Sequence, residues 1–154
     1  MLSYSGTALA ECYDWKLRRG GGKRYVADAS TINISLPGVP RKLSDFTVKA
    51  RGVVTPRIKN GECLDEKKRG KRARNFTVKI VSRAKKVKFC KPQWAGKGRQ
   101  LVAKVLIDDF DLAEVLVEKG FGSPSEDGKK SWCIRSLAGY LPQTSFRTRS
   151  QFSP

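Results

Sequence analysis

The stretch VVTPR (53–57) and the basic segment that follows it contain residue types that handle phosphate groups. In VVTPR the hydroxyl of Thr55 and the guanidinium of Arg57 stand where a short strand is expected to end in a turn. Between Glu66 and Asp108 the chain has fifteen basic residues and no acidic one. Lysine and arginine side chains hydrogen-bond to phosphate oxygens. The pattern therefore indicates anion binding more directly than acid–base catalysis.

The composition describes one basic domain. Its 154 residues suit a single core, and 32 basic against 14 acidic residues give a net charge of +18. An excess of this size predicts a polyanionic partner, either nucleic acid or an anionic membrane surface. The alternative is a solvated basic surface that serves solubility. The sequence contains no histidine, so any hydrolysis would depend on carboxylates, a metal ion and arginine.

Cysteine usage and the N-terminal residues bear on the compartment. The sequence spacing of Cys12, Cys63, Cys90 and Cys133 is too wide for a zinc knuckle. We expect buried free thiols in a reducing compartment and keep a disulfide as the alternative. No apolar run reaches the roughly 18 residues of a membrane span, and the N-terminus lacks the basic leader and apolar stretch of a signal peptide. These features predict a cytoplasmic or virion-associated protein.

Hydrophobic periodicity predicts how the chain is organised around its core. Alternating apolar residues predict strands at 31–36, 46–54, 87–90 and 100–107. Helical spacing predicts helices at 65–86, 111–121 and 131–140. Gly52 is expected to bend the second strand, and Asp111 and Gly120 to cap the second helix. The buried stripe of the first helix is predicted to contain Ala73, Phe76, Ile80, Val81 and Ala84.

This order of strands and helices indicates an α+β fold, namely a five-stranded OB-type Greek-key β-barrel with two or three α-helices. We expect an N-terminal extension at 1–22, the barrel domain at 23–140 and a basic, irregular C-terminal tail at 141–154. The tail, together with the helix predicted at 131–140, is a candidate docking site for a protein partner.

Three stretches in series resemble the staphylococcal-nuclease (SNase, thermonuclease) family. They are YVADASTINI (25–34), FTVKARGVVTPR (46–57), and the residues from CLDEKKRG (63–70) to VLVEKGFG (115–122). They keep the order and spacing of the family's metal-binding hairpin, its D-T-P-E stretch, its first helix and its G-R turn. The resemblance implies an SNase-like barrel that hydrolyses phosphodiesters of DNA and RNA with Ca²⁺.

The same resemblance places the family's metal-binding and water-activating positions on residues of other chemistry. The hairpin carboxylate falls on Ser30, and the acid two residues earlier is kept as Asp28. The carboxylate of D-T-P-E falls on Val54, Thr55 is kept, and the glutamate that serves the water falls on Arg57. An isopropyl group cannot bind Ca²⁺, and a guanidinium cannot accept a proton. A degenerate active site without Ca²⁺ or another cofactor is therefore implied.

The family's phosphate-binding positions keep their positive charge. They fall on Lys49 and on Arg99, which is the catalytic position that this chain retains. Together with Arg57 they are expected to line one positive concavity on the barrel. The full set of nucleic-acid-binding candidates is Lys49, Arg57, Arg99, Lys97, Lys71 and Arg74.

Three functional hypotheses remain. The first is a module that binds DNA or RNA without sequence preference and cuts poorly or not at all, with Trp94 stacking on bases and Phe89 and Tyr25 in the core. The second is an active nuclease with a rearranged metal site drawn from Asp28, Glu62, Asp65 and Glu66. The third is a structural or interaction protein of a virion or mobile element.

Overall fold

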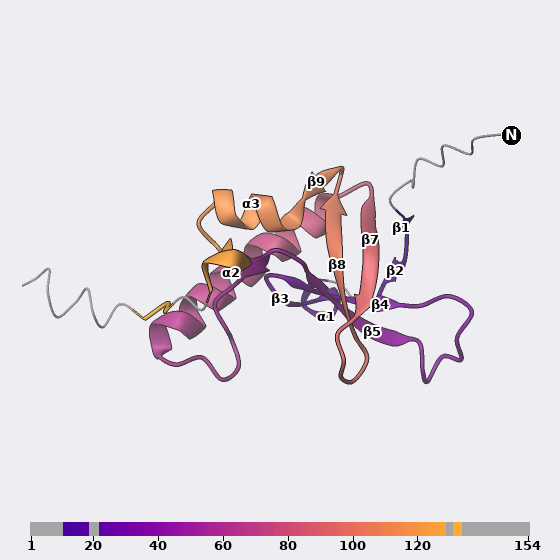
Figure 1. Ribbon diagram of the computed structural model, residues 1–154, viewed down its shortest axis with the longest axis horizontal. Helices are drawn as coiled ribbons and strands as arrows, with labels where there is room; N and C mark the ends of the chain where they lie inside the picture. Colours follow the sequence, from indigo (N-terminus) through magenta and orange to yellow (C-terminus); the bar gives the residue numbers. More distant parts are fainter. Residues whose placement is uncertain (1–10, 19–21, 129–130, 134–154) are drawn as a thin grey trace, which may run out of the picture.

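The fold combines one large sheet with two longer helices (Figure 1). The computed structural model describes residues 11–18, 22–128 and 131–133. Its strands are β1 (Cys12–Tyr13), β2 (Lys16–Leu17), β3 (Val26–Asp28), β4 (Thr31–Ser35), β5 (Asp45–Ala50), β6 (Val53–Val54), β7 (Val87–Trp94), β8 (Gln100–Ile107), β9 (Phe110–Asp111) and β10 (Ser123–Pro124). Its helices are α1 (Gly22–Tyr25), α2 (Leu64–Arg83) and α3 (Leu112–Glu118), with a 3₁₀ turn, η1 (Ser125–Asp127). The predicted α+β class is confirmed.

The large sheet has the strand order β1-β7-β8-β5-β4-β2, with β3 added to β4 and β9 added to β8. β5 and β8 run parallel, whereas β4 and β5, like β7 and β8, are antiparallel. β6 and β10 form a separate antiparallel pair. Within the described residues no pairing joins β1 to β2, so this sheet is not closed into a barrel. The predicted OB-type barrel is therefore not confirmed.

The two ends of the sheet belong to one short segment, residues 12–17. Its first part pairs with β7, where Cys12 lies opposite Cys90, and its second part pairs with β4. Trp15, between the two strands, stacks on Phe89 of β7 and on Tyr13, with ring centroids 5.5 and 5.1 Å away. The Tyr13 hydroxyl donates to the Glu11 carboxylate, which raises the pKa of Tyr13. Residues that the sequence assigned to an extension thus contribute to the sheet.

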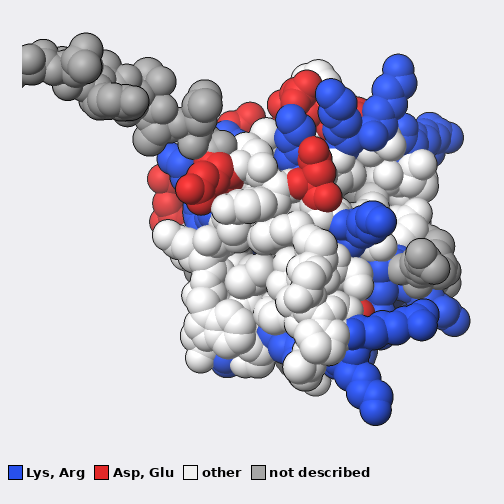
Figure 2. Space-filling view, turned by 90° about the vertical axis from the view of Figure 1, so that its right-hand side faces the viewer, with Lys and Arg blue, Asp and Glu red and all other residues white. Residues whose placement is uncertain are grey.

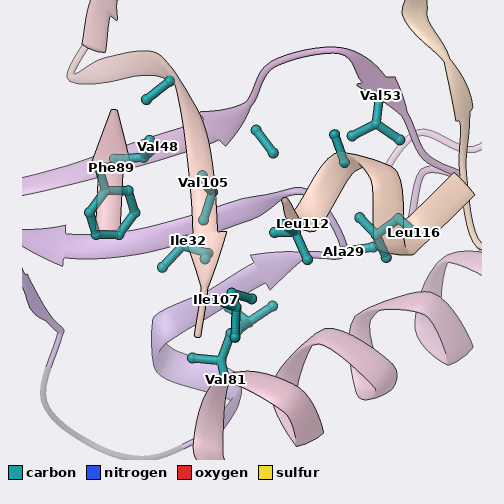
Figure 3. Close-up of a cluster of buried hydrophobic side chains, with 14 of the residues drawn as sticks. Ala29, Ile32, Val48, Val53, Val81, Phe89, Val105, Ile107, Leu112 and Leu116 are labelled. Atoms are coloured by element: carbon teal, nitrogen blue, oxygen red, sulfur yellow. The ribbon is translucent and has the colours of Figure 1, made fainter. Parts of the chain in front are cut away.

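The core lies between the sheet and the two longer helices (Figure 3). Ile32 of β4, Val48 of β5, Val81 of α2 and Leu116 of α3 point into it, and each is at most 3% exposed. Burial of a side chain of this size contributes roughly 1.5–3 kcal/mol. Because a slip of one residue would turn each strand's apolar face outward, this burial also sets the register of the sheet.

α2 confirms the predicted helix at 65–86, and its buried stripe agrees with the predicted one at Ala73 and Val81. Its buried residues are Glu66, Gly70, Ala73, Thr77 and Val81, whereas Phe76, Ile80 and Ala84 are partly buried at the edge of the core. Gly70 lies so close to the chain before α2 that an added Cβ would stand 2.8 Å from the Pro56 carbonyl oxygen. The Thr77 hydroxyl donates to the Ala29 carbonyl at 2.7 Å. Close backbone approach and hydrogen bonding, rather than apolar side chains, define most of this face.

The second predicted helix is confirmed with its caps. The Asp111 carboxylate accepts a hydrogen bond from the Ala113 amide at 2.9 Å, and Gly120, just beyond α3, has a φ of +76°. Gly52, between β5 and β6, has a φ of +92°, as its predicted bend requires. The helix predicted at 131–140 does not begin there, because 131–133 have no regular structure. Residues 134–140 and the predicted tail at 141–154 lie outside the described residues.

The prediction of free thiols is wrong. The structure has disulfides between Cys12 and Cys90 and between Cys63 and Cys133. Each joins residues at least 70 positions apart, so sequence spacing contains no signal for the pairing. Disulfides are typical of oxidising environments, and the argument for a reducing compartment therefore loses its basis. None of the described helices has the length and apolar composition needed to cross a bilayer.

Candidate nucleic-acid interface

The hairpin between β3 and β4 meets the VVTPR stretch. The Ser30 and Thr55 hydroxyl oxygens are 3.2 Å apart, and Ser30 is buried. The Asp28 carboxylate accepts from both the amide and the hydroxyl of Ser30, at 2.9 and 3.1 Å. An aspartate that bonds to the amide two residues later stabilises a tight turn, and here it closes the hairpin. We call the group Asp28, Ser30, Val54 and Thr55 the hairpin junction.

The hairpin junction does not suit Ca²⁺. Calcium takes six to eight oxygen ligands, several of them carboxylates. The junction offers one carboxylate, from Asp28, and one of its oxygens already accepts two hydrogen bonds from Ser30. The hydroxyls of Ser30 and Thr55 bond to each other, and Val54 offers no side-chain ligand. No hydrolytic step through a metal ion follows from these residues.

Of the acids proposed for a rearranged metal site, Glu62 and Glu66 lie together away from the hairpin junction. Within the described residues, ligand atoms of Glu62, Glu66 and Cys133 lie within 4.8 Å of one another, and Asp28 does not belong to this group. The Cys133 sulfur is bonded to Cys63, so it is not a thiolate. The two carboxylate oxygens of Glu66 accept from the backbone amides of Arg57 and Glu62, at 3.0 and 2.5 Å. The group is better described as the anchor of the α2 N-terminus.

Glu66 is the structural residue that sequence reasoning missed. It is only 5% exposed, and its two amide bonds hold the loop between β6 and α2 in place. Cys63 is the N-cap of α2, and its sulfur accepts from the Glu66 amide. A glutamate three residues after an N-cap is the sequence signature of a capping box, but the signature usually begins with serine or threonine rather than cysteine.

The predicted phosphate-binding cations come from three segments, namely β5, the loop after β6 and the turn before β8. Lys49 is exposed and lies opposite Thr31 of β4, next to the hairpin junction. Arg57 is exposed, and its backbone amide is bound by Glu66. Arg99 lies toward the start of β5, where its guanidinium donates to the Lys42 carbonyl at 3.0 Å.

Arg99 and Lys97, both exposed, line a pocket of about 380 Å³ with Arg18, Asp45 and five further residues, and Lys49 is not among them. Trp94 stands at the end of β7, is 59% exposed, and contacts Phe46 edge-on with ring centroids 6.5 Å apart. Phe89 is fully buried and Tyr25 partly buried, as predicted. This end of the sheet therefore combines cations with an exposed aromatic ring.

α2 carries the largest basic surface among the described elements. Of the two predicted contacts on it, Lys71 is exposed, whereas the partly buried Arg74 donates to the Val26 carbonyl at 3.0 Å and ties α2 to β3. The exposed cations of α2 are Lys67, Lys68, Arg69, Lys71, Arg72, Lys79 and Arg83. The ion pairs Arg18–Asp45 and Lys104–Asp111 lie outside α2. Within the described residues none of these exposed cations has an ion-pair partner.

On the face shown in Figure 2, acidic side chains lie in the upper part, where Lys and Arg side chains stand among them. Lys and Arg continue along the right-hand margin to the bottom, and the centre of this face carries mostly uncharged residues. Positive charge therefore predominates along the lower right-hand margin of this face.

No protein-family model matches the chain, and a search of curated proteins finds no match either. The resemblance to the staphylococcal-nuclease family therefore remains a hypothesis that is carried by the residues of this chain.

Proposed function

We propose that the protein is a nucleic-acid-binding module of SNase-like design whose phosphodiester-cleaving site is impaired. The observation that carries this proposal is the exposed surface of α2, where lysines and arginines follow one another without an ion-pair partner among the described residues. Such a surface is complementary to a partner with regularly spaced negative charges.

The energetics favour a polyanion over a solvated surface. Like charges three and four residues apart on a helix destabilise it, and α2 has several such pairs, including Lys67–Lys71 and Lys68–Arg72. A phosphate backbone relieves this repulsion and releases its condensed counterions, so binding weakens as salt rises. Contacts to phosphates carry no sequence information, and the module is therefore expected to bind without sequence preference.

The arrangement of the strands supports an OB-type barrel as the underlying fold. An OB-fold is a partly open, five-stranded Greek-key barrel. In this chain β3, β4, β5, β8 and β7 are consecutive neighbours in the sheet. The two ends of the sheet meet in the segment 12–17, which pairs with β7 at one end and β4 at the other. A curled sheet is consistent with this connection.

Impaired cleavage follows from the hairpin junction. Its hydroxyls and single carboxylate form a hydrogen-bonded group in place of a metal site. The exposed Arg57, at the position of the family's water-activating glutamate, cannot act as a base and repels a cation. The residues at these positions are better suited to binding a phosphodiester than to hydrolysing it.

Two assays test the proposal together. Labelled oligonucleotides should bind with an affinity that falls steeply as the salt concentration rises. The logarithm of the affinity, plotted against the logarithm of the salt concentration, should have a slope of roughly −0.9 for each phosphate contacted. A plasmid-nicking assay with Ca²⁺, Mg²⁺ or Mn²⁺ should show no cleavage above background. Metal-dependent nicking that disappears in Arg99→Ala would overturn the impaired-site argument, and affinity that does not change with salt would overturn the binding argument.

A gain-of-function variant examines the hairpin junction directly. Ser30→Asp, Val54→Asp and Arg57→Glu together restore carboxylates to the positions that the resemblance assigns to metal and water. Because Ser30 and Thr55 already touch, we expect calorimetry to detect Ca²⁺ binding by the triple variant and none by the unmodified protein. A matched variant, Lys59→Asp with Arg57→Glu, changes the net charge by the same amount in the neighbouring loop and should not bind.

A further inference from the structure

A pocket of about 410 Å³ lies between the first turns of α2 and the chain that follows α3. It is separate from the hairpin junction and from the pocket at Arg99. Its lining residues are Pro56, Asp65, Lys68, Arg69, Arg72, Gly120, Phe121 and Trp132. The volume falls in the range of pockets that hold small organic ligands.

One wall of this pocket is cationic. Lys68, Arg69 and Arg72 lie three and four residues apart on α2, so their side chains are neighbours on the helix surface. All three are exposed and have no ion-pair partner within the described residues. Asp65 also lines the pocket, but no ion pair joins it to these cations. The wall therefore offers donors for an anionic group and one carboxylate acceptor.

The lining also has an aromatic part, formed by Phe121 and Trp132, that is held in place. Phe121 packs on Phe76 of α2 with ring centroids 4.8 Å apart, and its amide donates to the Leu116 carbonyl at 2.8 Å. Trp132 is only 6% exposed, and its neighbour Cys133 is bonded to Cys63, the N-cap of α2. The disulfide thus fastens the tryptophan to the helix that carries the cations.

We propose that this pocket binds a nucleotide. Its phosphate would lie against Lys68, Arg69 and Arg72, its ring against Phe121 and Trp132, and a hydroxyl or amino group would donate to Asp65. A pocket of cations alone would take any small anion, whereas the aromatic wall and the acid add a requirement for a ring that carries hydrogen-bond donors. This inference rests on the proposed function, because the pocket would hold one nucleotide of a strand bound on α2.

The chemistry is the same for a free nucleotide and for the phosphorylated 5′ end of a strand, so the experiment includes both. Calorimetry with adenosine 5′-monophosphate, adenosine and inorganic phosphate tests the free form. We expect the nucleotide to bind at least 10-fold more tightly than either fragment. Equal affinity for inorganic phosphate and the nucleotide would overturn the proposal, because the aromatic wall would then contribute nothing.

Two variants on α2 separate the pocket from general surface charge. Arg72→Gln removes a lining cation, and Arg83→Gln removes an exposed cation of the same helix that does not line the pocket. A hydrogen bond to a charged group is strong enough that Arg72→Gln should weaken nucleotide binding roughly 10-fold, and Arg83→Gln less than about 2-fold. Similar losses in both variants would show that only the net charge matters.

The strand form is tested with a short single-stranded oligonucleotide carrying either a 5′-phosphate or a 5′-hydroxyl. We expect the phosphate to improve binding several-fold in the unmodified protein and to make no difference in Arg72→Gln. If the oligonucleotide binds well but neither its 5′-phosphate nor the free nucleotide has any effect, the pocket proposal fails and the proposed function stands. If the nucleotide binds but oligonucleotides do not, the proposed function fails instead.

The disulfide provides an independent check on the aromatic wall. Replacing Cys63 and Cys133 together by serine releases Trp132 from α2, and we expect nucleotide affinity to fall while oligonucleotide binding through the remaining cations persists. Circular dichroism verifies that this variant is folded. Unchanged nucleotide affinity in the folded variant contradicts the role of Trp132.

Discussion

α2 and α3 are packed against the same core but carry opposite surfaces. Every charged residue of α2 beyond its first turn is basic, and its two acids, Asp65 and Glu66, are at least partly buried. The exposed residues of α3 and its flanks are mainly acidic: Asp108, Asp109, Glu114, Glu118, Glu126 and Asp127. Both helices bury apolar residues in the cluster shown in Figure 3. Packing requirements therefore do not explain the difference in charge, and α2 is the helix whose surface suits the proposed anion binding.

The two helices also begin differently. α3 uses the Asp111 carboxylate as its N-cap, whereas α2 begins at Cys63, whose sulfur is a weak acceptor, and relies on the buried Glu66 and on a disulfide. The N-terminus of α2 is thus held to the fold by a disulfide and a buried carboxylate, whereas that of α3 has its N-cap. The disulfide and the carboxylate offset the mutual repulsion of the cations on α2.

The largest effect is expected from neutralising one helix at a time. Four-fold replacement by glutamine on α2 should lower oligonucleotide affinity on the order of 100-fold near 0.1 M salt and reduce the salt slope by roughly 3 to 4. The residues changed are Lys67, Lys68, Lys71 and Arg72. Glutamine has nearly the helix propensity of lysine, so the fold should persist. Fluorescence anisotropy at several salt concentrations measures both quantities.

The matched change on the acidic region is amide replacement of Glu114, Glu118, Glu126 and Asp127. It alters net charge by the same amount with opposite sign, and we expect affinity to rise by less than about 5-fold with little change in slope. Equal and opposite effects of the two sets of substitutions would contradict the proposed role of α2, because binding would then depend on the total charge of the protein.

A smaller effect, on stability, is expected from Glu66→Gln. The amide keeps one acceptor oxygen for two backbone donors, so one partly buried N–H loses its acceptor, at a cost of about 2 kcal/mol. Asp65→Asn, in the same turn, removes a charge without a hydrogen bond of this kind and should cost under about 0.5 kcal/mol. Urea unfolding monitored by tryptophan fluorescence compares them. Similar costs would mean that Glu66 is not the anchor of α2.

The elements that the sequence predicted correctly are those with a long periodic signal. The strands at 31–36 and 100–107 bury one face, and the Asp111 cap and the Gly52 bend follow from local backbone requirements. β1 and β2 have two residues each, too few for any period. The buried stripe of α2 was predicted in part, at Ala73 and Val81, and its other members were missed because Glu66, Gly70 and Thr77 are not apolar.

Little of the candidate site was predictable from local sequence. The resemblance assigns Ser30 and Thr55 to the family's metal-binding positions, and their hydroxyl oxygens lie 3.2 Å apart although the two residues are 25 positions apart in sequence. The cysteine pairs and the pocket at Trp132 also join residues that are distant in sequence, and only the tertiary fold brings them together. The hydrogen bond from the Arg99 guanidinium to the Lys42 carbonyl was not predicted for the same reason.

The smallest effect concerns the start of α3, where two contributions of Asp111 can be separated. Its carboxylate caps the helix at the Ala113 amide and also pairs with Lys104 at 3.6 Å. Asp111→Ala removes both and should cost about 1 kcal/mol. Asp111→Asn keeps an N-cap acceptor and loses only the ion pair, whose lysine is half-exposed, so it should cost a few tenths of a kcal/mol. If Asp111→Asn is as costly as Asp111→Ala in urea unfolding, the acidic helix depends on charge rather than on its cap, and the contrast with the anchoring of α2 does not hold.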